Sequence, residues 1–365
     1  MIAQDVLDLP TAQARRDAAV ATTWHSQMPD DKAMLRAAAE LTRDIAEARP
    51  GIYWLDMLAS ALVGYAALAG AILLANPLAA VASGVLAALA LYRALLFIHE
   101  LTHIHKDALP GFRFGWNALV GVPLLIPSFM YEGVHTQHHA RTRYGTLEDP
   151  EYLPLALMKP WSLPVFALTA ILLPPALLVR SALLVPLGAL IPPLRTLVWE
   201  RASALAINPQ YRRRKPEGTF ARMVFWQELA CSAWAIALVA ASFAWGWRPL
   251  LIALCVVSLT AFLNQVRTLV AHLWENDGEA MTVTAQYLDS VNVPPPARFS
   301  GLWAPVGLRY HALHHLLPSM PYHSLAECHR RLEAHLGLES TYRRAAYPGL
   351  TPLLARLARS TMKPR

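Results

Sequence analysis

Long apolar runs alternate with polar stretches along this chain. Residues 57–75 contain no charged side chain, and residues 77–98 form a second apolar run interrupted only by Arg93. A helix needs about 20 predominantly apolar residues to cross a bilayer. The pattern therefore predicts a hairpin of two membrane-spanning helices.

A second pair of apolar runs occupies residues 229–247 and 250–266, with tryptophans at the turn between them. Two hairpins leave both chain ends on one side of the membrane. The loop before the second pair is basic, whereas the two hairpin turns together contribute only Arg248. Because basic loops stay in the cytoplasm, we expect a multi-pass protein of the inner (cell) membrane with both termini cytoplasmic. The basic loop residues are Arg201, Arg212, Arg213, Arg214, Lys215 and Arg222.

A third apolar segment, from Leu163 to Pro193, is harder to interpret. Six prolines interrupt it and Arg180 lies in its middle, so each half is short for a span. We expect an interfacial or half-inserted hairpin that crosses the membrane either not at all or twice, because the residues on both sides of it must face the same compartment.

The polar ends of the chain have a simpler pattern. Residues 1–50 are Ala-rich, and Leu35, Leu41 and Ile45 are spaced for one apolar helix face. This predicts a cytoplasmic or interfacial helical segment. Residues 341–365 are expected to form a basic cytoplasmic tail.

Between these ends, residues 51–340 are expected to form one membrane domain. The predicted fold class is all-α: an integral-membrane protein with about four transmembrane helices in two hairpins, interfacial helices and a cytoplasmic helical cap. Residues 99–222 and 273–340 would build that cap, which also contains the candidate chemistry.

Composition supports a membrane protein. The chain of 365 residues is 55% hydrophobic and 16% charged, against roughly a quarter charged residues in soluble domains. Its net charge of +7 comes from residues beside the apolar spans, and no nucleic-acid-binding motif accompanies them, so we expect no nucleic-acid partner. The opening residues lack the apolar core of a secretory signal.

Histidines carry the candidate chemistry. Nine of the fourteen fall in four places at the cytoplasmic ends of the predicted spans. HELTH places two imidazoles one helical turn apart, and HTQHH and HALHH each have the spacing i, i+3, i+4, which directs side chains to one region of a helix. The residues in these three motifs are His99, His103, His135, His138, His139, His311, His314 and His315.

The ninth histidine, His272, stands where the fourth span ends. A single histidine at a helix end is more often a capping or interfacial residue than a ligand. However, it leaves the bilayer at the same face as the three motifs, which makes it a further candidate ligand.

Imidazole ligands suit zinc, copper, iron and nickel. The number of histidines exceeds what a single tetrahedral or octahedral ion can use, so two ions are implied. Zinc has no redox chemistry, whereas an iron pair can activate O2, and the apolar setting suits a hydrocarbon substrate. A pair of irons is therefore favoured.

HxxxH, HxxHH and HxxHH, in that order and among hydrophobic hairpins, resemble the membrane fatty-acid desaturase superfamily, which includes hydroxylases and a branch that makes terminal alkenes. HHARTRYGTLEDPEY, RTLVAHLWENDGE and LWAPVGLRYHALHHLLPSMPYH resemble a bacterial branch. The resemblance covers roughly residues 50–340. It implies two iron ions held by the eight motif histidines, with His272 similar to an additional ligand of some members. Acyl-CoA desaturases have asparagine where this chain has Thr268, which puts their water-mediated iron coordination in doubt.

The resemblance also implies O2 as co-substrate and hydrogen abstraction from a fatty-acyl chain, carried as free acid, CoA, acyl carrier protein or lipid. Desaturation is the leading expectation, with hydroxylation or oxidative decarboxylation to a terminal alkene as alternatives on the same site. The chain has no flavin or nicotinamide fingerprint. We therefore expect an external electron donor of the ferredoxin or rubredoxin type, docking on the basic cytoplasmic face.

Two other classes remain open from sequence alone. HELTH is also a literal HExxH motif, in which Glu100 would be the general base of an intramembrane zinc metalloprotease. This hypothesis leaves both HxxHH motifs unexplained. A metal transporter would place its ligands at mid-membrane depth, whereas the interiors of the predicted spans contain no histidine.

The remaining polar residues receive weaker expectations. Among the other histidines, His105 and His323 could support a ligand, and His25, His329 and His335 are expected at the surface. Ligating histidines usually donate their second ring nitrogen to a carboxylate or a carbonyl. The candidate carboxylates near the motifs are Glu132, Glu148, Asp149, Asp277 and Glu279. Arg141 and Arg143 could pair with a substrate headgroup.

Overall fold

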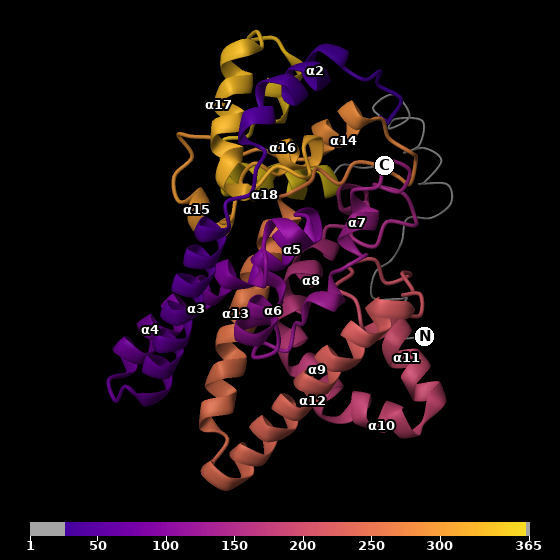
Figure 1. Ribbon diagram of the computed structural model, residues 1–365. Helices are drawn as coiled ribbons and strands as arrows, with labels where there is room; N and C mark the ends of the chain where they lie inside the picture. The colour runs from indigo at the N-terminus through magenta and orange to yellow at the C-terminus, as the bar shows by residue number, and fades with distance from the viewer. Residues whose placement is uncertain (1–25, 363–365) are drawn as a thin grey trace.

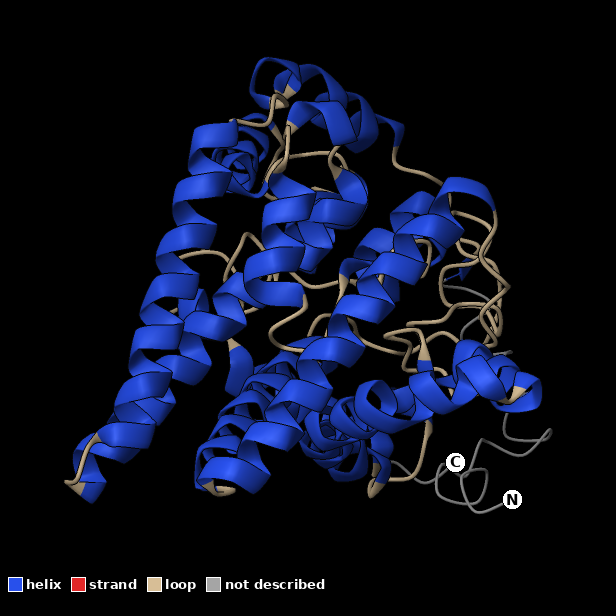
Figure 2. Cartoon of the chain, turned by 60° about the horizontal axis from the view of Figure 1, so that its bottom comes forward, coloured by secondary structure: helices blue, strands red, loops and turns tan. Residues whose placement is uncertain are grey.

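A computed structural model describes residues 26–362 of the chain. Its elements are helices joined by loops, with no strand among the described residues (Figure 2). Five helical segments are long and apolar enough to cross a membrane. The predicted all-helical, membrane-type fold is therefore confirmed.

The first predicted hairpin is formed by α3 (Pro50–Leu73) and α4 (Pro77–Leu95). Asn76 starts α4: its side-chain oxygen accepts a hydrogen bond from the backbone N–H of Ala79 at 3.0 Å, and Pro77 suits the first helical position. Arg93, the one charge in this apolar run, pairs with Asp56 on α3. The helical run continues almost directly into α5 (Phe97–His103).

The second hairpin is formed by α12 (Gly218–Trp245) and α13 (Arg248–Leu269). Gly246 makes the turn at a φ of 93°, a backbone conformation that glycine adopts readily. The hairpins contact each other through α13 and α4, where the Thr260 hydroxyl donates to the Ala88 carbonyl at 3.1 Å. In Figure 1 both hairpin turns lie at the lower end of the molecule, and α2 and α17 lie at the upper end.

The third apolar segment is more continuous than the prolines indicated. Residues 162–190 form one helical run of 29 residues, the fifth candidate span, and the chain turns back at Ile191 into α11 (Pro192–Ala202). Prolines are accommodated at the starts of its successive short helices. Buried Arg180 pairs with Glu228 on α12 at 2.6 Å, which explains a charge in this run. The helical run is composed of α8 (Ser162–Thr169), η6 (Ala170–Leu172), α9 (Leu173–Val179), η7 (Arg180–Leu184) and α10 (Val185–Leu190).

Short helices cover the upper end of the spans. The predicted amino-terminal helix is present in part as α2 (Lys32–Leu41), and its apolar face packs with α17 (Leu325–His335). α18 (Leu350–Thr361) lies in the predicted tail and buries Leu353 and Leu357 against the body of the protein. The other α-helices are α6 (Phe112–Trp116), α7 (His135–His138), α14 (Val283–Asp289), α15 (Ser300–Trp303) and α16 (His311–Leu316).

Candidate metal centre

The structure brings all nine candidate histidines together in two groups. Within each group, one side-chain nitrogen of every member lies within 4.8 Å of those of the others. The first group has five histidines and the second has four. The first contains His99, His103, His135, His139 and His314, and the second contains His138, His272, His311 and His315.

The helical spacing decides which group a side chain joins. His135 and His139 lie four residues apart on or next to α7 and share the first group, whereas His138, one residue out of that register, joins the second. In α16 the pair with i, i+4 spacing, His311 and His315, lies in the second group, and His314 lies in the first. α7 and α16 therefore each contribute to both groups, and α5 contributes only to the first.

His272 is positioned by a short extended segment and not by a helix. α13 ends at Leu269, and the next residues pair with the chain after α14: His272 forms a bridge with Ser290. The N–H of Leu273 donates to the Asp289 carbonyl at 2.7 Å. This pairing turns the imidazole toward α16, where its Nε2 lies 3.0 Å from Nε2 of His311.

Several imidazoles are oriented through Nδ1, which leaves Nε2 for the centre of a group. Nδ1 of His138 lies 2.9 Å from a carboxylate oxygen of buried Asp149. Nδ1 of His135 contacts Glu151, and Nδ1 of His272 lies 2.8 Å from the hydroxyl of Tyr144. Such contacts fix the tautomer of a metal-binding histidine.

The facing nitrogens fit a bound metal. Nε2 of His139 lies 3.0 Å from that of His135 and 3.1 Å from that of His314. When Nδ1 carries the proton, both facing Nε2 atoms present lone pairs, which a shared cation stabilises. His99 and His103 point the same way, because Nε2 of each is buried without a hydrogen-bond partner.

Burial keeps most of these imidazoles in the neutral form that binds metals. It holds their pKa well below the usual value, and neighbouring histidines or Arg267 lower it further. His138 differs: burial lowers its pKa, but the charge of Asp149 and the hydrogen bond to it raise the pKa above the usual value. Apart from His138, these imidazoles are therefore neutral and present lone pairs to a cation. The residues with lowered pKa are His135, His139, His272, His311, His314 and His315.

Comparison with known proteins agrees with the clustering of the histidines into candidate metal sites. The family model for fatty acid desaturases matches residues 75–346. The chain belongs to this family. It is also 50% identical over 336 residues, covering 90% of this chain and 94% of the relative, to a protein named ceramide hydroxylase from Caulobacter vibrioides (strain NA1000 / CB15N). No solved structure matched the chain.

Membership of the desaturase family makes the protein an oxidoreductase and overturns the metalloprotease hypothesis. The structure gives a physical reason: Glu100 is buried, and one of its oxygens accepts hydrogen bonds from the Tyr53 hydroxyl at 2.5 Å and the Tyr322 N–H at 3.2 Å. A carboxylate held in this way links α5 to α3 and to the loop after α16. It is not free to act as a general base on a metal-bound water.

Residues behind the histidines were only partly predictable. Asp149 was among the candidate carboxylates, whereas Glu132 and Glu148 lie near arginines instead. Glu151 and Asp289 were missed. Glu151 lies two residues after Asp149, so its position near the HTQHH motif could have marked it as a further candidate carboxylate. Asp289 is distant in sequence from every motif and reaches His272 through Tyr144, whose hydroxyl donates to it at 2.7 Å.

Burial raises the pKa of Glu151 to about 7 and that of Asp289 to about 6. Arg267 is a further unpredicted neighbour, a buried cation on α13 whose charge lowers the pKa of His272 and His311. The desaturase-type site is therefore surrounded by buried charges of both signs.

The other histidines lie outside both groups. His105 and His335 are exposed, and Nε2 of His323 accepts a hydrogen bond from the backbone N–H of Arg49 at 3.2 Å. The surface prediction for His329 is wrong: it is buried, with Nδ1 2.7 Å from the Tyr342 hydroxyl. Its side of α17 packs against Tyr310 and Tyr342. The prediction for His25 lies outside the described residues.

Proposed function

We propose that the protein is an O2-dependent di-iron hydroxylase of a ceramide-class lipid. The observation that carries the proposal is the pair of buried histidine groups at the ends of membrane-length helices in a member of the desaturase family. Hydroxylation takes precedence over desaturation because the relative at 50% identity is named a ceramide hydroxylase.

Each histidine group would hold one iron ion. The five-histidine group and the four-histidine group together supply the nine ligands, including His272. When bound, the irons supply O2 activation and removal of hydrogen from an unactivated C–H bond. Imidazole-only groups accept iron, zinc, copper or nickel by ligand type alone, and family membership selects iron among these.

The protein's own residues orient the ligands and exclude water. Asp149, Glu151 and Tyr144 fix the tautomers of the histidines they contact. Fully buried Trp274 packs next to the imidazole of His272, with ring centroids 5.0 Å apart. The lipid chain would enter from the bilayer between the spans, with its polar end toward the cap.

The reaction requires electrons from outside the protein. One oxygen atom of O2 enters the C–H bond, and the other leaves as water with two protons and two electrons. We place the site and both termini in the cytoplasm, on the inner membrane, where a ferredoxin- or rubredoxin-type donor would deliver those electrons. The basic loop before α12 supports this orientation.

Lipid mass spectrometry tests the proposal. The protein is expressed in a bacterium that lacks ceramide hydroxylase, with ceramide supplied and ¹⁸O2 in the headspace. The expected product is ceramide with one added ¹⁸O atom. Loss of two hydrogens without oxygen would identify a desaturase instead, and unchanged ceramide with a modified phospholipid acyl chain would contradict the substrate class.

A pair of histidine variants provides the matched control. His272→Ala removes one of the four nitrogens of the second group, so product formation should cease and bound iron should fall. His105→Ala removes an imidazole that is 79% exposed and lies two residues after the HELTH motif, so iron content and product should stay at the wild-type level. Equal iron loss in both variants would contradict the assignment of His272.

A further inference from the structure

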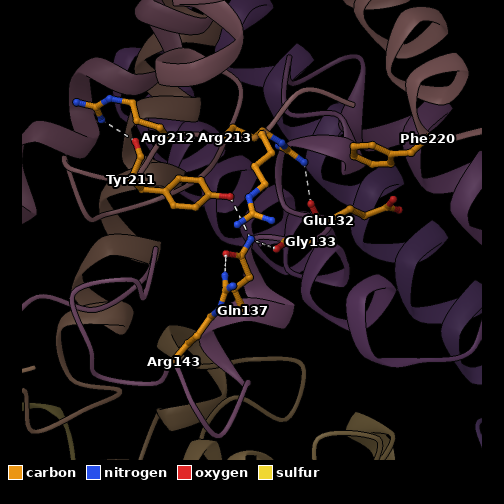
Figure 3. Close-up of a pocket in the computed structure, with 9 residues that line it drawn as sticks. Glu132, Gly133, Gln137, Arg143, Tyr211, Arg212, Arg213 and Phe220 are labelled. Atoms are coloured by element: carbon orange, nitrogen blue, oxygen red, sulfur yellow. Dashed lines mark hydrogen bonds between the residues drawn. The ribbon is translucent and has the colours of Figure 1, made fainter. Parts of the chain in front are cut away.

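A cavity of about 400 Å³ lies beside α7 (Figure 3). Its walls come from residues before, within and after α7, the segment Tyr211–Arg214 and the first turn of α12. It is separate from the space between the two histidine groups, since no histidine lines it. Nothing in the proposed hydroxylation uses this cavity.

The cavity has an excess of positive charge. Four arginines line it, against one carboxylate, that of Glu132. Glu132 is paired with Arg113, which is not part of the lining. Exposed Glu148, also outside the lining, lies 3.6 Å from Arg143, so three of the four arginines have no carboxylate partner among the described residues. A cavity with this charge favours an anion. The four are Arg143, Arg212, Arg213 and Arg214.

The wall of the cavity is held in place by hydrogen bonds. Gln137 donates to the Gly133 carbonyl at 2.7 Å and to the Tyr211 hydroxyl at 3.2 Å, and accepts from Arg143 at 2.6 Å (Figure 3). Arg213 is buried, and its guanidinium donates to backbone carbonyls of the neighbouring segments, including that of Glu132 at 2.7 Å. An anion would therefore meet a preformed surface.

Other donors of the cavity remain available. The side chain of Arg214 is exposed and makes no hydrogen bond or ion pair with residues 26–362; only its carbonyl is used, accepting from Trp199 Nε1 at 2.7 Å. Gly133 leaves open space on its own side, because an added Cβ would meet no atom within 4 Å. The cavity therefore has a free cation and room for a group of several atoms.

The cavity lies at the depth of lipid headgroups. α12 has 28 residues, which span about 42 Å at about 1.5 Å each, whereas the hydrocarbon core is about 30 Å thick. Trp245, 83% exposed at the far end of α12, suits the opposite interface. A tilt of α12 would take up part of this excess length, but an exposed charge inside the hydrocarbon is costly. Exposed Arg222 therefore places the first turn of α12, with Phe220 in the cavity wall, at or beyond the hydrocarbon boundary. Exposed Arg222 and Trp226 mark the same boundary.

We propose that this cavity binds the phosphate group of an anionic membrane phospholipid. A concave, arginine-lined cavity at headgroup depth suits a single phosphate, because guanidinium groups bind phosphate oxygens with paired N–H donors. An acidic protein would instead require a broad complementary face. We place this lipid apart from the one that is oxidised, because no candidate metal ligand lines the cavity.

Two variants of Gly133 that differ in charge but have nearly the same shape test the site. This residue has a φ of 73°, which asparagine and aspartate tolerate better than other side chains. Gly133→Asp places a carboxylate in the cavity, and Gly133→Asn places an amide of nearly the same shape there. Binding of phosphatidylglycerol and phosphatidylcholine to full-length protein in detergent is measured by native mass spectrometry, with inorganic phosphate as competitor.

Both lipids carry the phosphate, but the arginines repel the choline cation of phosphatidylcholine, so we expect wild-type protein to prefer phosphatidylglycerol by about tenfold or more. Gly133→Asn should retain this preference, and Gly133→Asp should lower it by about tenfold because it adds a like charge near the phosphate. Competition by inorganic phosphate would show that the phosphate alone is recognised; its failure to compete, with the Gly133 difference intact, would show that the lipid chains contribute. Both results support the site.

Equal binding of phosphatidylglycerol to the two Gly133 variants would overturn the proposal. A protein that binds inorganic phosphate but shows no binding of phosphatidylglycerol would overturn it as well. Loss of affinity for an acidic ferredoxin in Gly133→Asp, with lipid binding unchanged, would assign the cavity to a protein partner. If the Gly133 variants melt early, Arg214→Gln replaces them, with Arg36→Gln on α2 as the control of equal charge. Only Arg214→Gln should then weaken phosphatidylglycerol binding.

Discussion

The contact between Asp149 and His138 allows a sharp prediction about the metal site. Asp149 is completely buried. Its two oxygens lie 2.9 and 3.1 Å from Nδ1 of His138 and accept the backbone N–H groups of Gly145 and Glu151 at 2.9 and 2.8 Å. Asp149→Asn turns one oxygen into an NH2 donor, which must then face one of these N–H donors.

Two costs follow from that change. Loss of the carboxylate behind a ligating histidine lowers metal affinity by about 10–100-fold, which is about 1.4–2.7 kcal/mol. A buried donor left without an acceptor costs a further 1–3 kcal/mol or so of folding stability, roughly the penalty for an unsatisfied polar group. We therefore expect Asp149→Asn to fold with a lower melting temperature and to lose iron from the second histidine group.

The assay separates metal loss from unfolding. Iron per protein is measured by elemental analysis on material that elutes as a single folded species, and melting is recorded with and without added iron. Glu148→Gln is the matched control, because it makes the same chemical change one residue earlier in a side chain that is 74% exposed. Wild-type iron content and activity in Asp149→Asn, or equal iron loss in Glu148→Gln, would refute the reasoning.

Two further predictions concern groups away from the metal. Glu228→Gln leaves Arg180 buried without its counter-ion and should cost about 3–5 kcal/mol of stability. Arg195→Gln removes the 36% exposed partner of the same carboxylate and should cost less than about 1 kcal/mol. Equal melting temperatures of the two variants in detergent would be evidence against a buried pair. Burial lowers the pKa of His329, partly opposed by Glu333, so the unfolded chain binds more protons there and stability falls as pH drops below about 6.5. His329→Gln should reduce the loss of melting temperature between neutral pH and about pH 5.5, and an identical pH profile for wild type and variant would contradict this.

The clustering of the candidate histidines could be predicted from sequence because their spacing is local. An i, i+4 pair shares a helix face whatever surrounds it, so HELTH, HTQHH and HALHH were readable without the fold. Assigning each histidine to one group or the other required the structure, because the assignment depends on how α7 faces α16. His272 was found through span counting, and the short pairing with Ser290 that orients it had no sequence signal.

Long-range contacts account for most of what the sequence did not indicate. Prolines in residues 162–190 led to the expectation of two short halves, but the helical run continues because proline fits the first turn of a following helix. Arg180 within it is compensated by Glu228, 48 residues later. His329 lies in a polar stretch, yet its face of α17 is buried against Tyr310 and Tyr342. Partners at such separations leave no pattern in a single sequence.

Ligation by histidine leaves the charge balance of the site to residues behind the ligands. Neutral imidazoles add no charge, so an ion in each group would bring uncompensated positive charge into a buried space, which is costly. Two carboxylates lie beside the five-histidine group: Glu151 contacts His135, and an oxygen of Glu100 lies 3.6 Å from Nδ1 of His99. The four-histidine group has two: Asp149 directly and Asp289 through Tyr144. Asp149 is the carboxylate in direct contact with the four-histidine group, and for this reason its removal should affect the ion of that group before the ion of the five-histidine group.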